Sequence, residues 1–234
     1  MAGLADRKHV FFDLDDTLWD FEKNSSKVIR ELFSEFELES KLNASFFEFY
    51  EVYKAVNHQL WTRFYLRQID RHYLRNQRFH LAFLAFAYDN YKENLLITQH
   101  YFRRSPQGKL LKEGCLETLD YLKERFSLHI FTNGFKETQH IKLQNSGLSP
   151  YFSTVLISEE HGLAKPDKKI FRLAESMAGT TRDQCVMIGD NLDCDVQGAL
   201  NAGWEAIYFS EKKPEHYKGH HITSLGGLPL LFEI

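Results

Sequence analysis

The sequence predicts a doubly wound α/β sheet with a helical segment inserted after its first strand. Short, mostly apolar runs of the kind found in buried parallel strands recur along the chain and alternate with helix-like stretches. Their spacing is regular except once, because about a hundred residues separate the first run from the second. The alternation is typical of a mostly parallel sheet covered by helices on both faces, and the long interval indicates an insertion.

Five apolar runs are expected to form the strands: Val10 to Leu14, Leu128 to Phe131, Val155 to Ile157, Val186 to Ile188 and Ala206 to Phe209. Helix-like stretches accompany them at 117–125, 137–145, 168–177 and 196–201. Glycines such as Gly147, Gly179 and Gly203 follow several of these stretches, as is common at helix ends. The sheet and its helices would form a core domain of residues 1–19 and 107–234.

The inserted segment is predicted to be a helical cap domain of residues 20–106. Two sets of apolar residues recur at helical spacing: Val28, Ile29, Leu32, Phe33 and Phe36, and then Phe46, Phe49, Tyr50, Tyr53, Leu60 and Phe64. Asn43 and Ser45 are candidate N-caps for the second helix, and residues 70–92 again have a helix-like pattern. Proline is absent until Pro106, which favours helix throughout this segment.

Composition excludes several classes of protein. With 43% hydrophobic and 26% charged residues, the chain of 234 residues has the composition of a globular protein. A net charge of −3 provides no positive field for a nucleic acid, and no stretch approaches the roughly 20 apolar residues of a membrane helix. We therefore expect a cytoplasmic protein with no membrane or nucleic acid partner. Its three cysteines fit neither a zinc site nor a disulfide framework, so we expect them to be reduced.

Two carboxylates follow the first predicted strand. Asp13 and Asp15 are two residues apart, and side chains at this spacing point the same way in a strand, so both could face one ligand. Ligands of open α/β sheets bind beyond the carboxyl ends of the strands, which is where this pair lies. The alternative is an acidic loop in which Asp15 or Asp16 caps a turn.

Groups suited to phosphate follow the next two strands. Thr132, Asn133 and Gly134 offer a hydroxyl, an amide and a flexible backbone to an anion, although an Asn-Gly pair is also common in ordinary turns. Lys165 follows the third strand and could supply a point charge to a phosphate, although a lone lysine before proline is usually solvated.

A second acidic cluster, Gly189 to Asp195, follows the fourth strand. Oxygen ligands at this density suit magnesium. We expect Asp190 to bind the metal and Asp195 to lie behind it, while Asp193 and Asp195 could instead favour the first turn of the next helix. Independent coincidences would rarely align at the ends of four successive strands, and clustered carboxylates repel one another without a cation. The sequence therefore predicts a metal and phosphate site at this edge.

Taken in order, these motifs resemble the haloacid dehalogenase-like (HAD) hydrolase superfamily across essentially the whole chain. The motifs are Asp13-x-Asp15-x-Thr17, Thr132-Asn133, Lys165 and Gly189-Asp190 followed by Asp195. The family often has glycine where this chain has Asp16. Three further stretches, 55–61, 132–135 and 158–166, look like the bacterial pyrimidine 5′-nucleotidases.

The resemblance implies a Rossmann-like core and magnesium-dependent hydrolysis of a phosphate monoester through an aspartyl phosphate. Asp13 would be the nucleophile, and Asp15 would protonate the leaving alcohol and then activate water. The metal would be bound by Asp13, the main-chain carbonyl of Asp15 and Asp190. Thr132, Asn133 and Gly134 would hold the phosphate with Lys165, and Thr17 would orient the loop.

The resemblance also implies that the cap selects the leaving group, for which Trp19, Asn57 and Trp61 are the candidate residues, although aromatic residues at helical spacing usually belong to a core. The expected substrate is a small phosphate monoester, namely a pyrimidine nucleoside monophosphate. Sugar phosphates and a phosphotransferase or mutase remain alternatives. A receiver-like signalling domain shares the aspartate, hydroxyl and lysine, but it needs no acid two residues after the nucleophile.

Overall fold

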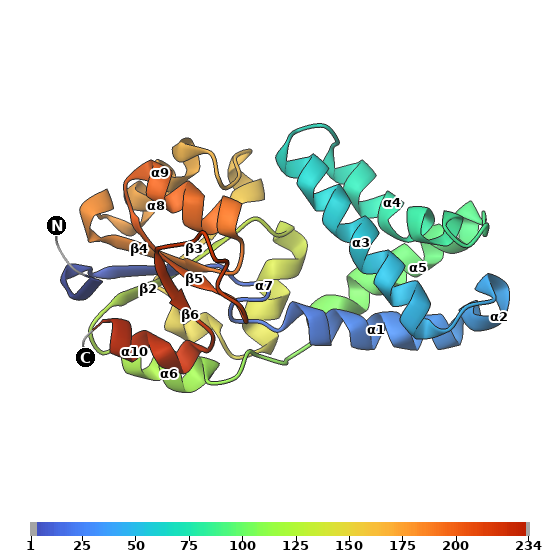
Figure 1. The fold of residues 1–234 in the computed structure, drawn as a ribbon, viewed down its shortest axis with the longest axis horizontal. Coiled ribbons are helices and arrows are strands. Elements are labelled where there is room, and N and C mark those ends of the chain that lie inside the picture. The colour runs from blue at the N-terminus through green and yellow to red at the C-terminus, as the bar shows by residue number, and fades with distance from the viewer. Residues whose placement is uncertain (1–3, 233–234) are drawn as a thin grey trace. The chain divides into compact units, whose positions relative to one another are not determined.

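The computed structural model describes residues 4–232, and the chain divides into two compact units (Figure 1). The first comprises residues 1–21 and 109–234, and the second comprises residues 22–108. No helix within residues 4–232 is both long and apolar enough to cross a bilayer.

The first unit is built on a six-stranded, wholly parallel sheet. Its strands are β1 (His9–Phe12), β2 (Ser127–Thr132), β3 (Thr154–Ile157), β4 (Cys185–Gly189), β5 (Glu205–Phe209) and β6 (His220–Ile222). They lie in the order β3-β2-β1-β4-β5-β6, so the direction of winding reverses between β1 and β4. The predicted doubly wound α/β fold is confirmed.

Successive residues of β1 divide the core into two layers, one on each side of the sheet. Val10 and Phe12 belong to one buried cluster and Phe11 to the other. The first cluster is completed by α6 (Cys115–Leu122), α7 (Lys136–Asn145) and α10 (Leu228–Leu231), and the second by α8 (Lys168–Ala178) and α9 (Gly198–Ala202). Figure 1 shows α8 and α9 on the opposite face of the sheet from α6 and α10.

Two features of this unit differ from the sequence prediction. The edge strand β6 was not expected, because it is only three residues long and begins with two histidines, which carry no apolar signal. The helix expected at 196–201 begins earlier, as a π-helical segment (Leu192–Gln197) that leads into α9. Single π-helical turns are rare in proteins overall, and those that do occur often lie at functional sites.

The remaining short helices of the described chain are 3-10 turns, at Leu4–Asp6, Ser105–Gln107, Ser149–Tyr151, Ser158–His161, Arg182–Gln184 and Leu225–Gly227.

The second unit is helical. It contains α1 (Phe21–Glu35, of which Phe21 belongs to the first unit), α2 (Leu38–Leu42), α3 (Phe46–Tyr65), α4 (Arg71–Leu84) and α5 (Tyr91–Arg104). A largely aromatic core joins the five helices, with Ile29, Leu42, Phe49, Phe83 and Ile97 among its members.

Helix caps explain the boundaries within the second unit. Ser45 caps α3 in a reciprocal capping box with Glu48, as predicted. The prediction for Asn43 was wrong, because this residue ends α2 in a left-handed conformation with φ of 48°. The helical pattern of 70–92 is interrupted after α4, and Asn90 then caps α5 by accepting a hydrogen bond from the amide of Glu93.

The two segments of the first unit that border the insertion pair with each other. The amide of Asp20 donates to the carbonyl of Leu110, and the amide of Lys112 donates to the carbonyl of Leu18. A bridge between Trp19 and Leu111 lies between these bonds. Both ends of the insertion are thereby attached to the turn that carries Asp15 and Asp16.

A buried histidine in β2 predicts a loss of stability in acid. His129 is 1% exposed and shares a 3.0 Å hydrogen bond with His9. Burial, and then the charge of His9, lowers the pKa of His129 to about 4. Between this value and the ordinary histidine pKa of about 6.5, the unfolded chain binds more protons than the folded chain, so stability falls as the pH falls through that window.

At pH 5 this single group is expected to cost about 2 kcal/mol relative to pH 7.5. Urea unfolding of His129→Phe at both pH values should show a smaller difference than the wild type by about this amount. The same change at the exposed residue His72 is the control. An identical pH dependence in wild type and His129→Phe would contradict the prediction.

Candidate active site

The candidate site lies where the winding of the sheet reverses. Asp13 follows β1, Thr132 ends β2 and Asp190 follows β4, so three of the predicted residues occur at the carboxyl ends of neighbouring strands. In open α/β sheets this point leaves a crevice, because the connections on its two sides run to opposite faces.

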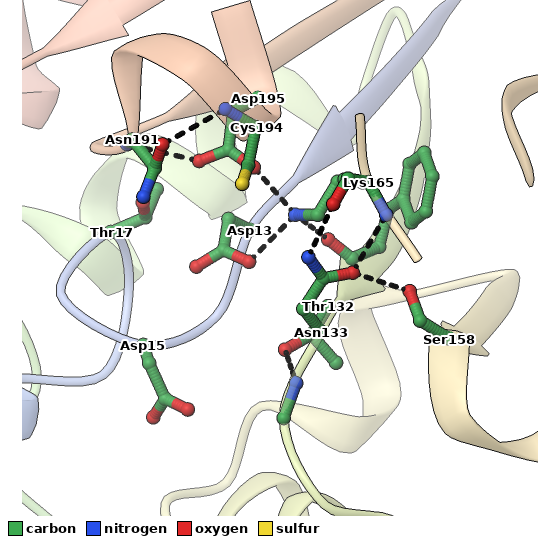
Figure 2. Close-up of polar contacts among 12 residues, drawn as sticks. Asp13, Asp15, Thr17, Thr132, Asn133, Ser158, Lys165, Asn191, Cys194 and Asp195 are labelled. Atoms are coloured by element: carbon green, nitrogen blue, oxygen red, sulfur yellow. Dashed lines mark hydrogen bonds and ion pairs between the residues drawn. The ribbon is translucent and has the colours of Figure 1, made fainter. Parts of the chain in front are cut away.

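Lys165 is the centre of the polar network (Figure 2). It is 1% exposed, and its Nζ donates to Oδ1 of Asp13 at 2.8 Å and to the carbonyl of Phe131 at 2.6 Å. The same Nζ lies 2.6 Å from Oδ1 of Asp195. Burial lowers the pKa of Lys165, but the charges of Asp13 and Asp195 outweigh it and hold the pKa above the ordinary lysine value. Lys165 is therefore a buried cation and not solvated surface.

The side chain of Asn133 fixes the loop that carries Lys165. Its Oδ1 accepts from the hydroxyl of Ser158 at 2.7 Å and from the amide of Lys165 at 2.9 Å. Its Nδ2 donates to the carbonyl of Lys165 at 3.0 Å. The side-chain amide, expected near a phosphate, is thus engaged with the loop after β3 in this structure.

Asp13, Asp190 and Asp195 form an acidic cluster whose nearest carboxylate oxygens all lie within 4.8 Å of one another. Burial, opposed by Lys165 and assisted by Asp195, raises the pKa of Asp13 to about 7. Burial and the charge of Asp13 also raise the pKa of Asp190 well above its ordinary value. Three close carboxylates beside one lysine carry more negative charge than the site neutralises.

Thr17 orients Asp190. The Thr17 hydroxyl donates to Oδ1 of Asp190 and accepts from the Asp190 amide, both at 3.1 Å. Thr17 is fully buried, so these reciprocal bonds occupy its side chain within the protein. Its placement is that of a residue acting through Asp190 and not through a substrate.

The turn after β4 fixes Asp195, the third member of the cluster. Its Oδ2 accepts from the amide of Asn191 at 3.0 Å, and Asn191 in turn caps the π-helical segment. A Cβ at Gly189 would lie 2.2 Å from Oδ2 of Asp195, so a glycine is needed for this close approach. Because both oxygens of Asp195 already meet donors, one of them Lys165, this carboxylate supports the site from within.

The acidic cluster fits a hard divalent cation. Carboxylate oxygens are the protein ligands that Mg²⁺ and similar ions prefer. A bound cation would offset the burial and the mutual repulsion that raise the pKa values of Asp13 and Asp190. Among the described residues, this is the group of three or more His, Cys, Asp or Glu side chains whose ligand atoms lie close enough together to bind one ion.

The expected direction of Asp15 was wrong. Strand β1 ends at Phe12, so the rule that residues i and i+2 share a face does not extend to Asp15. Its side chain instead points away from Asp13 in Figure 2, and both of its oxygens accept hydrogen bonds from α7. The donors are Lys142 and Gln139, which are not among the residues predicted from the sequence.

The Thr132 hydroxyl is arranged to donate a hydrogen bond. Its hydroxyl oxygen accepts from the amide of Gly134 at 3.1 Å and from Nε2 of Gln139 at 3.0 Å. With both lone pairs used, the hydroxyl hydrogen is the one group left to meet an anion. A Cβ at Gly134 would lie 1.4 Å from Nε2 of Gln139, so glycine here makes room for the glutamine.

Asp16 takes a conformation that glycine usually adopts. Its φ of 58° lies in the left-handed region, where Asp and Asn are tolerated more often than other side chains. The carboxylate pairs with Lys112 at 3.0 Å, across the paired segments that border the insertion. Asp16 thereby preserves the turn that separates Asp15 from Thr17.

The three candidates for leaving-group contacts lie in different environments. Trp19 is fully buried in the first unit, with Nζ of Lys142 4.6 Å from its ring centre, which is the placement of a core residue. Asn57 and Trp61 lie one turn apart on α3 and are partly exposed. Oδ1 of Asn57 is buried without a hydrogen-bond partner in the described chain.

Comparison with known proteins extends over nearly the whole chain. The chain is 34% identical to pyrimidine 5′-nucleotidase PynA of Streptococcus pneumoniae, over 91% of this chain and 86% of that protein. It is 29% identical to pyrimidine 5′-nucleotidase YjjG of Escherichia coli, over 90% of this chain and 89% of that protein.

A solved structure of HAD-hydrolase YfnB from Bacillus subtilis, bound to magnesium, superposes with a TM-score of 0.88 and 28% identity, covering 97% of this chain and 99% of that one. Residues 7–203 match the family described as haloacid dehalogenase-like hydrolase. The chain is therefore a phosphoric monoester hydrolase and belongs to the haloacid dehalogenase-like hydrolase family.

Proposed function

We propose that this protein is a magnesium-dependent 5′-nucleotidase that removes phosphate from pyrimidine nucleoside monophosphates through an aspartyl phosphate on Asp13. The observation that carries the proposal is the Asp13 carboxylate, fixed by buried Lys165 at the reversal point of the sheet and beside a cluster able to hold a cation. The similarity to PynA and YjjG over about nine-tenths of the chain supports the choice of substrate.

Asp13 is the nucleophile. Lys165 holds its Oδ1, which sets the rotation of the carboxylate. With Asp15 in its protonated form, attack on phosphorus forms the bond from Asp13 to phosphorus and breaks the bond to the nucleoside oxygen, which takes the proton from Asp15. In the second half of the reaction Asp15 takes a proton from water, the water oxygen attacks phosphorus, and Asp13 and inorganic phosphate are released.

Thr132 and Lys165 would stabilise the transferring phosphoryl group. The Thr132 hydroxyl has one hydrogen to donate, and Lys165 supplies positive charge without reorganisation, because three acceptors already fix its Nζ. We infer that the main-chain amide of Asn133 is a further phosphate contact. Gly134 would act indirectly, because its amide donates to the hydroxyl oxygen of Thr132.

Magnesium would be held by Asp13, Asp190 and the main-chain carbonyl of Asp15, with Asp195 behind them. When bound, the ion supplies positive charge that offsets the charge of the acidic cluster and of the phosphate. Thr17 keeps Asp190 directed toward the cluster through its two hydrogen bonds. The magnesium bound in the structure of YfnB supports this choice of ion.

A screen of phosphate release with magnesium tests the proposal. Uridine and thymidine monophosphates, including deoxy forms, are expected to be hydrolysed faster than adenosine or guanosine monophosphates, because a pocket for one ring would hold a purine out of line with Asp13. Faster hydrolysis of sugar phosphates, or equal rates on both nucleotide classes, would overturn the nucleotidase assignment. Phosphate transfer to an added alcohol in place of water would indicate a phosphotransferase.

The cap residues are predicted to act on selectivity alone. Asn57→Ala and Trp61→Ala should lower kcat/KM for uridine monophosphate by about tenfold, which is the effect of roughly one lost contact, while hydrolysis of 4-nitrophenyl phosphate stays within about twofold. Gln59→Ala, at an exposed position of the same helix, is the control and should change neither rate. Parallel loss of both activities would indicate a damaged fold.

A further inference from the structure

Helix α7 makes three hydrogen bonds to the carboxylate of Asp15, more than proton transfer itself requires. Nζ of Lys142 donates to Oδ1 of Asp15 at 2.6 Å and to Oδ2 at 2.9 Å. Nε2 of Gln139 donates to Oδ2 at 2.9 Å. Gln139 and Lys142 are three residues apart, so one face of the helix presents both donors to a single carboxylate.

Gln139 links Asp15 to the phosphate-binding hydroxyl. It is fully buried, and the two hydrogens of its Nε2 reach Oδ2 of Asp15 and the hydroxyl oxygen of Thr132. Nε2 is the atom of the amide that carries hydrogens, and both of its partners accept them with oxygen atoms. One amide therefore sets the separation of the acid–base group and the phosphate-holding group.

Lys142 is buried beside Asp15. It is 4% exposed, and its Nζ lies 4.6 Å from the ring centre of Trp19 and 5.6 Å from that of Phe21. A buried ammonium group is costly unless an anion accompanies it. Asp15 is that anion in the described chain, and the two rings complete the enclosure.

We propose that Gln139 and Lys142 are positioning residues for the proton transfers of Asp15. Lys142 fixes the direction of the carboxylate, and Gln139 ties it to Thr132, so that the proton donor and the held phosphate keep one geometry. Neither residue touches the substrate in this scheme. The inference rests on the proposed function, because it concerns the step in which the nucleoside oxygen takes its proton.

Replacement of Gln139 or Lys142 should therefore reduce activity by an amount that depends on the leaving group of the substrate. An alcohol such as a nucleoside leaves poorly without a proton, whereas 4-nitrophenolate leaves readily without one. The value of kcat/KM covers only the steps up to departure of the leaving group, so the later use of Asp15 as a base does not enter it. A misplaced Asp15 should therefore affect the two substrates unequally.

The experiment compares kcat/KM of Lys142→Met and Gln139→Leu on uridine 5′-monophosphate and on 4-nitrophenyl phosphate. We expect a fall of about 10- to 100-fold on the nucleotide, carried by kcat, and less than about threefold on the aryl phosphate. Lys136→Met and Gln144→Leu, at exposed positions of the same helix, are the matched controls and should leave both values unchanged. If Lys142→Met does not fold, Lys142→Gln, which retains a hydrogen-bond donor of similar length, is measured in its place.

The decisive measurement is a double-mutant cycle. In an Asp15→Asn background the carboxylate is already absent, so Lys142→Met should cause no further loss on the nucleotide. Equal losses on both substrates, or a further loss in the Asp15→Asn background, would overturn the positioning role. A wild-type protein that hydrolyses neither substrate would refute the proposed function itself and this inference with it.

Discussion

Asp13→Asn is expected to reduce phosphate release to background, a fall of at least about 10³-fold, because an amide does not attack phosphorus. The substitution preserves the shape of the side chain, and the amide oxygen can still accept the hydrogen bond that Lys165 donates to Oδ1. The loss should appear in kcat on every substrate, including 4-nitrophenyl phosphate, because both substrates require the same nucleophile.

The same variant should remain folded. Burial raises the pKa of Asp13 to about 7, so from about pH 4 upward the folded chain binds more protons at this residue than the unfolded chain, and its contribution to stability decreases as the pH rises to 7. At pH 8 without metal, Asp13→Asn removes that unfavourable charge and should unfold at the same or a higher temperature than the wild type. Asp183→Asn, on the exposed surface, is the control for both measurements. Near-normal turnover by Asp13→Asn would refute the mechanism.

Residues that follow directly from strand ends can be predicted from the amino-acid sequence. Apolar runs located five of the six strands, and parallel strands bring their carboxyl ends to one edge, so the strand order along the chain was enough to group Asp13, Thr132 and Asp190. The grouping of the acidic residues into one cluster follows from the same argument, because Asp13, Asp190 and Asp195 all come after strands that end at this edge.

Contacts that depend on side-chain direction could not be predicted. Asp15 lies beyond the end of β1, and its direction is decided by Gln139 and Lys142, more than a hundred residues away along the chain. On α7 the two residues look like ordinary polar helix positions, and their spacing of three is the one signal that could have paired them. The need for glycine at position 134 likewise could not be predicted, because it depends on the buried side-chain amide of Gln139 that lies against it.

Replacement of the two acidic residues after β4 should separate metal binding from support of Lys165. Asp190→Asn is expected to lower kcat/KM by about 10²-fold and to raise the half-activating magnesium concentration by at least about tenfold, because a neutral amide is a much weaker ligand for a hard cation. Part of the loss should be recovered at high magnesium. The half-activating concentration is measured by titrating metal into chelator-treated protein.

Asp195→Asn is expected to behave differently, because the contacts of Asp195 face inward. Its Oδ1 lies 2.6 Å from Nζ of Lys165, and its Oδ2 accepts from the amide of Asn191. Loss of this negative charge leaves the buried lysine with Asp13 as its one remaining carboxylate partner in the described chain, so Lys165 should bind the nucleophile more tightly and transfer should slow. The loss should persist at saturating magnesium, with a shift in half-activating concentration of less than about threefold. A shift as large as that of Asp190→Asn would make Asp195 a direct ligand of the metal, and full activity of the wild type in excess chelator would refute the metal site altogether.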